Sequence, residues 1–399
     1  MNTPSKPLAG VKVLELGTLI AGPFCTRILA EFGAEVIKVE SPDGGDPLRQ
    51  WRKLHEGTSL WWSVQARNKQ SITANLKHPD GLAVVRRLAE QADIVVENFR
   101  PGVLDKLGLG WSALSAANPG LVMVRLSGFG QTGPYRERPG FGAIGESMGG
   151  LRYITGFPDR PPVRTGISIG DSIAALWAAI GALMALRHRE VNGGAGQVVD
   201  VALYEAVFAM MESMVPEFDV AGFVRERTGN VMPGITPSNT HTTRDGRHII
   251  IGGNGDAIFV RLMRAIGRPD LADDPQLASN AGRDARAAEL YAAIDAWVAA
   301  HDGDAVLAAM EAAEVPASAI YSVADMFRDA QFAARGMFEA ANLPDGTPIH
   351  LPGIVPKLAE TPGGTEWLGP KLGEHTEAIL AGLGFSAAEI LALREKGAI

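Results

Sequence analysis

The fold of this chain is decided by residues 11–40, which read VKVLELGTLIAGPFCTRILAEFGAEVIKVE. Residues 11–16 and 35–40 are rich in valine, leucine and isoleucine, which is typical of buried strands. Between them, residues 23–32 repeat apolar side chains at helical spacing, and Gly33 stands where a helix stop is expected. A strand, a helix and a second strand in this order predict a βαβ unit with two parallel strands.

The same alternation continues through the first half of the chain. We expect helices over residues 81–91 and 171–189, and strands over 93–96, 121–126 and 197–201. Helices that alternate with strands predict a parallel sheet covered on both faces. The fold class is therefore α/β, with a Rossmann-like, doubly wound parallel sheet.

A change of rhythm near Gly222 predicts a second domain. A Gly/Pro-rich loop, a strand over residues 248–252 and several Ala-rich helices follow. We predict that residues 1–221 form the N-terminal part of a large domain and residues 222–316 a smaller α+β domain. Residues 317–399 are then a C-terminal part that returns to the large domain, with 317–323 rejoining its sheet.

Composition restricts the partners and the compartment. The 399 residues include 37 Lys+Arg and 45 Asp+Glu, which gives a net charge of −8 and argues against nucleic acid as a partner. The single cysteine, Cys25, has no internal disulfide partner, and residues 1–10 show no secretory pattern, so we expect a cytoplasmic protein. The most apolar run, 172–186, is shorter than the roughly 20 residues that span a bilayer, and we expect a buried helix there and no membrane partner.

Several common active-site patterns are missing from the sequence. The first turn, Leu16 to Gly22, lacks G-x-G-x-x-G, so the position of Glu40, about 20 residues further on, does not make a nicotinamide site. The eight histidines are scattered, which argues against a bound metal, and no G-x-S-x-G elbow occurs. Cys25 lies among apolar residues, as a structural thiol does.

Asp171 is the acid that the pattern singles out, because it follows Gly170 at the start of the long apolar helix. One interpretation makes it the N-cap, whose carboxylate accepts hydrogen bonds from the first backbone amides. The other makes it a nucleophile, since the positive end of a helix dipole keeps a carboxylate ionised. The sequence pattern alone leaves both open.

A second glycine-rich turn, Gly252-Gly253-Asn254-Gly255, lies between a predicted strand and a predicted helix. No Lys-Ser/Thr pair follows it, so it is not a P-loop. It is either a tight strand-to-helix turn or a mobile lid over a site.

Longer motifs carry a resemblance to a known family. They are LAGVKVLEL (8–16), AGP (21–23), GAEVIKVE (33–40), NKQSI (68–72), VENFRPG (96–102), GFGQTGP (128–134) and GDS (170–172). On these motifs the chain resembles the class III CoA-transferases of the CaiB/BaiF type, typified by formyl-CoA and carnitine CoA-transferases, from Pro7 to about Lys396.

The resemblance implies a catalytic role for Asp171, the covalent nucleophile, and a set of CoA contacts. The implied CoA-binding residues are Lys77, Asn98, Phe99, Arg100, Lys106 and Arg138. Ser41 stands where the family has a basic residue, and the loop Gly252, Gly253, Asn254, Gly255 falls where some members have a lid. The family needs no tightly bound cofactor and no metal, because coenzyme A and acyl-CoA are substrates, and it forms interlocked homodimers.

The resemblance leaves a choice of reaction. The α-methylacyl-CoA racemases of the same superfamily use a histidine where this chain has Phe141, so a transferase is favoured; a non-catalytic CoA-binding protein is a further alternative. For the transferase we expect succinyl-CoA as donor and a small dicarboxylic acid as acceptor. Arg49, Arg52 and Arg164 are either partners for the second carboxylate or ordinary surface charges.

Overall fold

A computed structural model describes residues 6–399, so the first five residues of the 1–10 stretch considered above lie outside the described part. By its internal contacts the chain divides into two compact units. The first comprises residues up to 151, 165–222 and 336–399, and the second comprises 152–164 and 223–335. The domain boundaries that the sequence indicates, 1–221, 222–316 and 317–399, stay a prediction.

The first unit is built on a six-stranded sheet whose strand order is β5-β2-β1-β6-β7-β8. All neighbouring strands in it are parallel, as the alternation of helices and strands predicts. The strands are β1 (Lys12–Glu15), β2 (Glu35–Glu40), β5 (Lys69–Thr73), β6 (Ile94–Glu97), β7 (Val122–Ser127) and β8 (Val198–Ala202). The predicted α/β fold with a Rossmann-like parallel sheet is confirmed.

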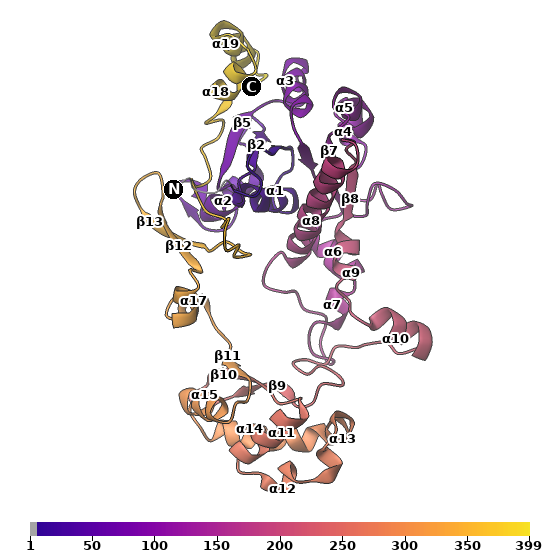
Figure 1. Ribbon diagram of the computed structural model, residues 1–399, viewed down its shortest axis with the longest axis vertical. Helices are drawn as coiled ribbons and strands as arrows, with labels where there is room; N and C mark the ends of the chain where they lie inside the picture. Colours follow the sequence, from indigo (N-terminus) through magenta and orange to yellow (C-terminus); the bar gives the residue numbers. More distant parts are fainter. Residues whose placement is uncertain (1–5) are drawn as a thin grey trace. The chain divides into compact units, whose positions relative to one another are not determined.

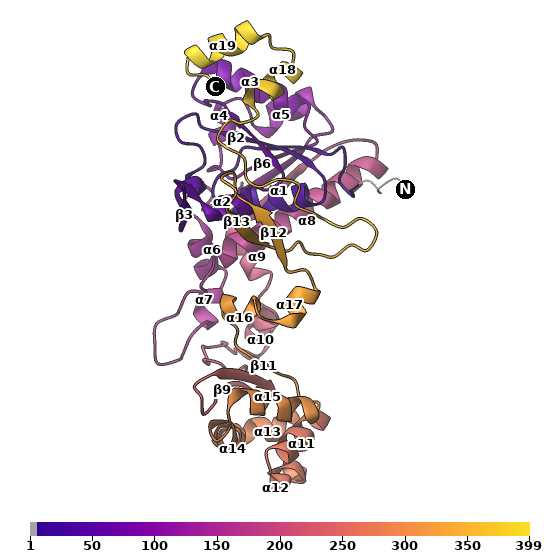
Figure 2. The same cartoon turned by 90° about the vertical axis from the view of Figure 1, so that its left-hand side faces the viewer.

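Consecutive strand residues point to opposite faces of this sheet and build two separate cores. Val13 belongs to one core and Leu14 to the other, and Val124 and Met123 divide in the same way. Helices α1 (Ala21–Glu31) and α8 (Ile169–Val191) contribute to the first core (Figures 1 and 2). Helices on the opposite face are α3 (Pro79–Glu90), α4 (Val103–Lys106), α5 (Trp111–Ala117), α18 (Thr376–Gly382) and α19 (Ala387–Glu395).

Helix α8 differs from the buried helix that the sequence predicts. It has 23 residues, starts two residues earlier than expected, and is long and apolar enough to meet a membrane-span criterion. One face is lined with alanines such as Ala178 and Ala182 and packs into the core with α1. The other face is exposed, with Trp177 and Met184 on it, so the predicted buried helix is buried on one face only.

The remaining elements of the first unit lie at the ends of the strands and on the C-terminal segment. They are the hairpin strands β3 (Leu54–His55) and β4 (Thr58–Ser59), helices α2 (Leu60–Gln65), α6 (Gly142–Met148), α9 (Leu203–Phe208) and α10 (Met214–Ala221), and the hairpin of β12 (Phe338–Asn342) and β13 (Pro348–Pro352). Helix α7 (Leu151–Ile154) lies where the chain passes from the first unit to the second.

The second unit contains a three-stranded antiparallel sheet of β9 (Ser238–Thr242), β10 (His248–Gly252) and β11 (Ala317–Ala319). Its helices are α11 (Asp256–Ala265), α12 (Pro269–Ala272), α13 (Asn280–Ala285), α14 (Ala287–Ala299), α15 (Gly303–Ala312), α16 (Val323–Met326) and α17 (Ala330–Ala334). The prediction that residues 317–323 rejoin the large sheet is wrong. Strand β11 pairs with β10 instead, where Ala317 lies opposite Ile251.

Candidate active site at the carboxyl edge of the sheet

The strand order reverses between β1 and β6, so the loops that leave these two strands in opposite directions open a crevice at the carboxyl edge of the sheet. In open α/β sheets this is the position where ligands bind. The loop after β1 spans residues 16–20 and the loop after β6 begins at Asn98. The side-chain amide of Asn98 hydrogen-bonds the loop after β1, so the two loops are tied together.

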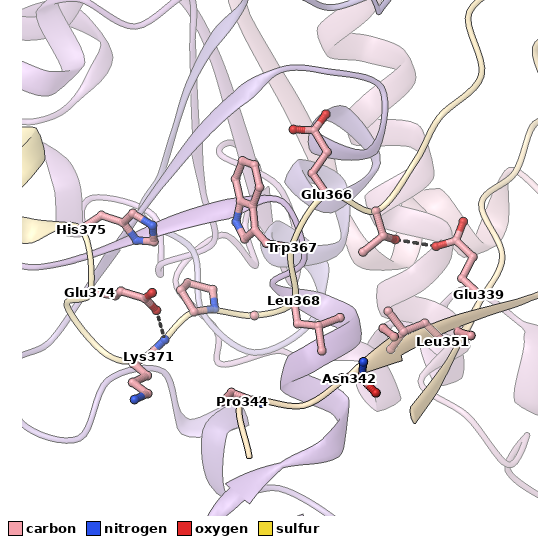
Figure 3. Close-up of a pocket in the computed structure, with 15 residues that line it drawn as sticks. Glu339, Asn342, Pro344, Leu351, Glu366, Trp367, Leu368, Lys371, Glu374 and His375 are labelled. Atoms are coloured by element: carbon pink, nitrogen blue, oxygen red, sulfur yellow. Dashed lines mark hydrogen bonds between the residues drawn. The ribbon is translucent and has the colours of Figure 1, made fainter. Parts of the chain in front are cut away.

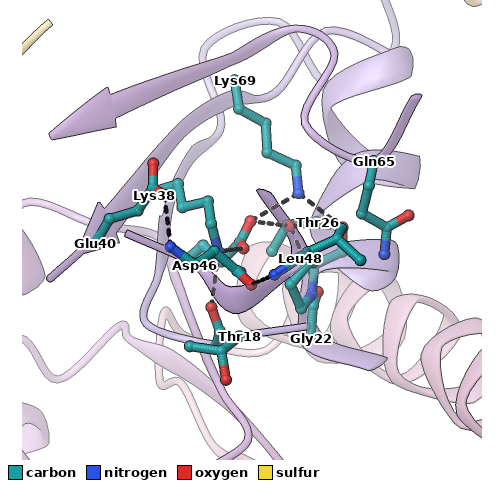
Figure 4. Close-up of polar contacts among 12 residues, drawn as sticks. Thr18, Gly22, Thr26, Lys38, Glu40, Asp46, Leu48, Gln65 and Lys69 are labelled. Carbon is teal, nitrogen blue, oxygen red and sulfur yellow. Dashed lines mark hydrogen bonds and ion pairs between the residues drawn. The ribbon is translucent and has the colours of Figure 1, made fainter. Parts of the chain in front are cut away.

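A buried polar cluster holds the loop after β1 in place (Figure 4). Lys38 on β2 donates to the carbonyl of Gly17 at 2.8 Å and to Glu15 at 2.6 Å. Asp46 accepts from the amide of Leu19 at 3.1 Å, and Leu19 has a positive φ of 65°. A leucine in this left-handed region is strained, so the Asp46 contact holds a conformation that the chain does not otherwise favour.

Most of the predicted CoA-binding residues lie at this same edge. Phe99 and Arg100 follow β6 directly, Lys106 ends α4, and Lys77 follows β5. Phe99 is half-buried against the core, whereas the three cations are exposed. Cations at such an edge are suited to pair with the phosphates of a nucleotide.

Arg138 lies in the loop after β7, and its guanidinium stacks 3.6 Å from the centroid of the Tyr135 ring. This aromatic ring also meets Phe129 edge-on, with centroids 5.9 Å apart. Arg138 is exposed and is oriented by the ring beneath it.

Asp171 is the third residue of α8, because the helix begins at Ile169 and Ser168 is its N-cap. The interpretation of Asp171 as the N-cap is therefore wrong, although the carboxylate stays in the first turn. There the positive end of a helix of 23 residues favours the ionised form. Asp171 is partly exposed.

A chain of close glycine contacts connects Asp171 to the carboxyl edge of β7. A Cβ atom placed on Gly128, the residue after β7, would lie 2.8 Å from the Cα of Gly140. Gly142, two residues later, opens α6 and lies against the Asp171 carboxylate. The nucleophile that the sequence predicts thus belongs to the same edge of the sheet as the predicted CoA contacts.

The predicted lid is fastened at several points within the second unit. The buried guanidinium of Arg283 donates to the carbonyl of Asn254 and to Asp256, both at 2.7 Å. The amides of Gly252 and Gly253 donate to the carbonyls of Pro316 and Pro237. These contacts describe a tight strand-to-helix turn, and the role of Gly252, Gly253, Asn254 and Gly255 as a lid stays a prediction.

Two charged residues that the sequence offers for ligand binding are paired with each other. Arg49 donates from Nε and Nη2 to the two carboxylate oxygens of Glu40, each at 2.8 Å, and both residues are buried. The prediction that Arg49 meets a substrate carboxylate is therefore wrong, and Glu40 is not free for a ribose. Arg52 and Arg164 are exposed, each within a different unit.

Other features do not add to this site. Burial raises the pKa of the Cys25 thiol to about 12, so the thiol is not a nucleophile at neutral pH. Within residues 6–399, no group of three metal-ligating side chains is placed to hold an ion.

A cavity of about 1150 Å³ lies between the β12–β13 hairpin and residues 365–375, and Trp367, Lys371 and His375 line it (Figure 3). It contains none of the predicted site residues.

Sequence reasoning missed three residues that shape the site. Asp46 holds the loop after β1, Gly142 packs on Asp171, and Glu146 is a buried carboxylate next to Gly170. The repeated glycines of residues 140–142 were a sequence signal for close packing, since backbone-to-side-chain contact at this distance excludes a Cβ. The long-range contacts of Asp46 and Glu146 have no local signal.

Comparison with known proteins adds a family and several relatives. A family model described as CoA-transferase family III matches residues 8–376. Succinyl-CoA–D-citramalate CoA-transferase of Chloroflexus aurantiacus is 52% identical over 398 residues, which cover 99% of each chain. The beta subunit of succinyl-CoA–L-malate CoA-transferase from the same organism is 42% identical, over 100% of this chain and 99% of that one. A crystal structure of a CAIB/BAIF family protein from Brucella suis is 37% identical, with a TM-score of 0.83 over 95% of this chain and 100% of that one.

Proposed function

Because this chain belongs to CoA-transferase family III and is a CoA-transferase, we propose that it moves CoA from succinyl-CoA to a small dicarboxylic acid, with Asp171 as nucleophile. The observation that carries the proposal is the place of Asp171, in the first turn of α8 at the carboxyl edge of the sheet. The dicarboxylic acceptor is supported by the names of two relatives, which specify citramalate and malate. Arg52 and Arg164 are the remaining candidates for its second carboxylate.

The first half of the reaction transfers CoA to the enzyme. The Asp171 carboxylate attacks the thioester carbonyl of succinyl-CoA, the carbon–sulfur bond breaks, and a mixed anhydride and CoA thiolate form. The thiolate then attacks the Asp171 carbonyl of the anhydride, which releases succinate and leaves an aspartyl-CoA thioester. An anhydride retains the activation of the thioester, which is why a carboxylate suits this task.

The second half repeats these steps in reverse with the acceptor. Its carboxylate attacks the aspartyl thioester, which releases CoA thiolate and forms a second anhydride. The thiolate attacks the acceptor carbonyl of that anhydride, so the new acyl-CoA leaves and the Asp171 carboxylate is restored. No proton is gained or lost over the cycle, and no redox group or metal takes part in it.

The chain's own residues hold CoA in this scheme. The loop after β1, with Asn98 and Phe99, forms the floor for the pantetheine or adenine part, and Lys77, Arg100, Lys106 and Arg138 pair with phosphates. Water must be kept from both anhydrides, since hydrolysis competes with transfer. We assign that task to the Gly252–Gly255 turn, acting as a lid.

We also propose that the enzyme is a cytoplasmic homodimer. Helix α8 exposes a stripe of large apolar side chains on the face opposite its buried alanines, and an apolar patch of this kind is typical of an interface. The stripe comprises Leu176 (47% exposed), Trp177 (41%), Ile180 (41%), Leu183 (40%) and Met184 (67%). A second copy of the chain is the occupant that this proposal names.

The test combines substrates with a variant of the nucleophile. Purified enzyme is incubated with succinyl-CoA and, separately, with malate, citramalate, glutarate and monocarboxylates, and new thioesters are identified by mass spectrometry. Equal turnover of monocarboxylates would contradict a dicarboxylate acceptor. An α-proton exchange without transfer would support the racemase alternative, and binding without turnover would support the non-catalytic one.

Asp171→Asn removes the nucleophile and its charge–dipole interaction with α8, which is worth about 0.3–1 kcal/mol. We expect it to fold and to lose transfer. Hydroxylamine added to wild type with succinyl-CoA should convert Asp171 to a hydroxamate, seen as a mass shift of its peptide. Asp80→Asn is the matched control, since Asp80 also lies in the first turn of a helix, α3, and should leave transfer unchanged. A folded Asp171→Asn enzyme with near wild-type transfer would disprove the covalent mechanism.

A further inference from the structure

The carboxylate of Asp171 occupies the space that a side chain on residue 142 would need. A Cβ atom built on Gly142 would lie 2.1 Å from Oδ2, 2.6 Å from Cγ and 3.1 Å from Oδ1 of Asp171. Distances of this size are far inside van der Waals contact, so no residue other than glycine fits while Asp171 keeps this position. The carboxylate therefore lies in space that the missing side chain of Gly142 leaves open.

A second residue of α6 supports the turn that carries Asp171. Glu146 is only 1% exposed, and its Oε1 accepts a long hydrogen bond of 3.4 Å from the amide of Gly170. A Cβ on Gly170 would lie 3.0 Å from Cγ of Glu146 and 2.8 Å from the carbonyl oxygen of Gly142. The N-cap Ser168 makes no side-chain cap hydrogen bond, so Glu146 supplies an acceptor to the first turn of α8 from a neighbouring helix.

Helix α6 is itself fixed by close packing on α9. A Cβ on Gly145 would lie 2.8 Å from Cβ of Leu203, and a Cβ on Gly149 would lie 2.7 Å from Cβ of Val207. Glycines at these positions let the two helices approach closely. The helix that carries Gly142 and Glu146 is thus held on one side by α9 while its other side meets the first turn of α8.

We propose that Gly142 and Glu146 are positioning residues that hold the Asp171 carboxylate in a single orientation for attack on the thioester. Gly142 does so by leaving room for the carboxylate, and Glu146 by accepting from the amide that precedes Asp171. The inference rests on the proposed role of Asp171 as nucleophile. A nucleophile restricted to one orientation gains rate, because a displacement of about 1 Å costs on the order of 100-fold.

Three variants test the inference by steady-state transfer from succinyl-CoA. Gly142→Ala should lower kcat about 100-fold, because a methyl group displaces the carboxylate. Glu146→Leu should lower kcat about tenfold with the KM for succinyl-CoA nearly unchanged, whereas Glu146→Gln keeps an acceptor oxygen and should retain kcat within about threefold. Hydroxylamine trapping should show slower labelling of Asp171 in the first two variants.

Gly181→Ala is the matched control, because its Cβ would lie 2.6 Å from Cγ1 of Val199, in the middle of α8 and away from both α6 and Asp171. It should lower the Tm while kcat per folded enzyme stays at the wild-type value. If Gly142→Ala and Glu146→Leu behave like this control, the inference is wrong. If Glu146→Gln loses as much kcat as Glu146→Leu, the hydrogen-bond role of Glu146 is wrong. A functional Asp171→Asn enzyme would instead refute the proposed function, so the two failures are distinguishable.

Discussion

Asn98 pairs with both backbone groups of Thr18. Its Nδ2 donates to the Thr18 carbonyl at 2.8 Å, and its Oδ1 accepts from the Thr18 amide at 2.8 Å. The contact joins the loop after β6 to the loop after β1, the place where the strand order reverses. The amide of Asn98 is thereby occupied by the protein itself, so its contribution to CoA binding is to shape the crevice.

Asn98→Ala should consequently weaken donor binding without touching the nucleophile. We expect the KM for succinyl-CoA to rise about tenfold and the free energy of unfolding to fall by about 1–3 kcal/mol, since two hydrogen bonds are lost. Asn118→Ala is the control, because Asn118 also donates to a backbone carbonyl, that of Ala92, but before β6 rather than after it. The KM is measured from initial rates over a range of succinyl-CoA concentrations. An unchanged KM in Asn98→Ala would contradict the role of the Asn98–Thr18 hydrogen bonds in shaping the crevice.

The exposed cations at the carboxyl edge should bind the phosphates of CoA. Replacing Lys77, Arg100 or Lys106 by alanine should raise the KM for succinyl-CoA several-fold and weaken its dependence on salt, because screening acts on the interaction that is lost. Lys12→Ala is the matched control, since Lys12 is an exposed cation at the opposite, amino end of β1. If Lys12→Ala raised the KM for succinyl-CoA as much as the other three variants, the effect would come from the change in net charge and not from contacts with the phosphates.

The apolar stripe on α8 should be covered by a second copy of the chain. A charge on it is costly when buried, so Met184→Glu should convert a dimer to a monomer at micromolar concentration, as light scattering would measure. Leu391→Glu provides the comparison, because Leu391 is 54% exposed on α19 and lies outside the stripe. A wild-type protein that is monomeric under these conditions would overturn the homodimer.

Local patterns in the sequence were sufficient to predict the sheet. Val13 and Leu14 point into different cores, and both are apolar, as strands buried on two faces require. The helix and strand signals of residues 23–40 were equally local, and α1 and β2 lie there. The ends of elements were harder to predict. Helix α8 begins at Ile169, two residues before the predicted start at Asp171, and the pattern missed this because Ile169 and Gly170 have no feature that marks them as helical.

Contacts between distant residues were beyond the reach of these patterns. Arg49 looked free for a ligand in the sequence, yet Glu40 neutralises it nine positions away. Strand β11 has the composition for either sheet, and only its pairing with β10 decides between them. The Asp171 carboxylate lies in space left open by Gly142, which is 29 residues earlier in the chain. No periodic pattern in the sequence connects these two residues.

The buried cluster of Glu15, Lys38 and Lys69 near the loop after β1 should make the free energy of unfolding depend on pH. Glu15 accepts from Lys38 at 2.6 Å and from Lys69 at 2.8 Å, and all three are buried. Burial by itself raises the pKa of Glu15, but the two ammonium groups outweigh it and bring the pKa down from 4.5 to about 2. A carboxylate with a lowered pKa in the folded state contributes stability above the unfolded value of 4.5, and this contribution is lost as the pH falls toward 2.

Glu15→Gln tests this linkage by urea unfolding between pH 7 and pH 3. At pH 7 the variant takes the Glu15 carboxylate from buried Lys69 and leaves Lys38 paired with Asp46, so we expect it to be less stable than wild type by about 3–5 kcal/mol. The difference should narrow below pH 4.5, because Glu15 of the unfolded wild type takes up a proton there while folded Glu15 stays ionised until about pH 2, which lowers the stability of the wild type but not that of the variant. Glu366→Gln is the control, because Glu366 and Lys6 form a more exposed ion pair. Its loss should lower the free energy of unfolding by at most about 1 kcal/mol. A stability difference between wild type and Glu15→Gln that does not change from pH 7 to pH 3 would contradict the lowered pKa.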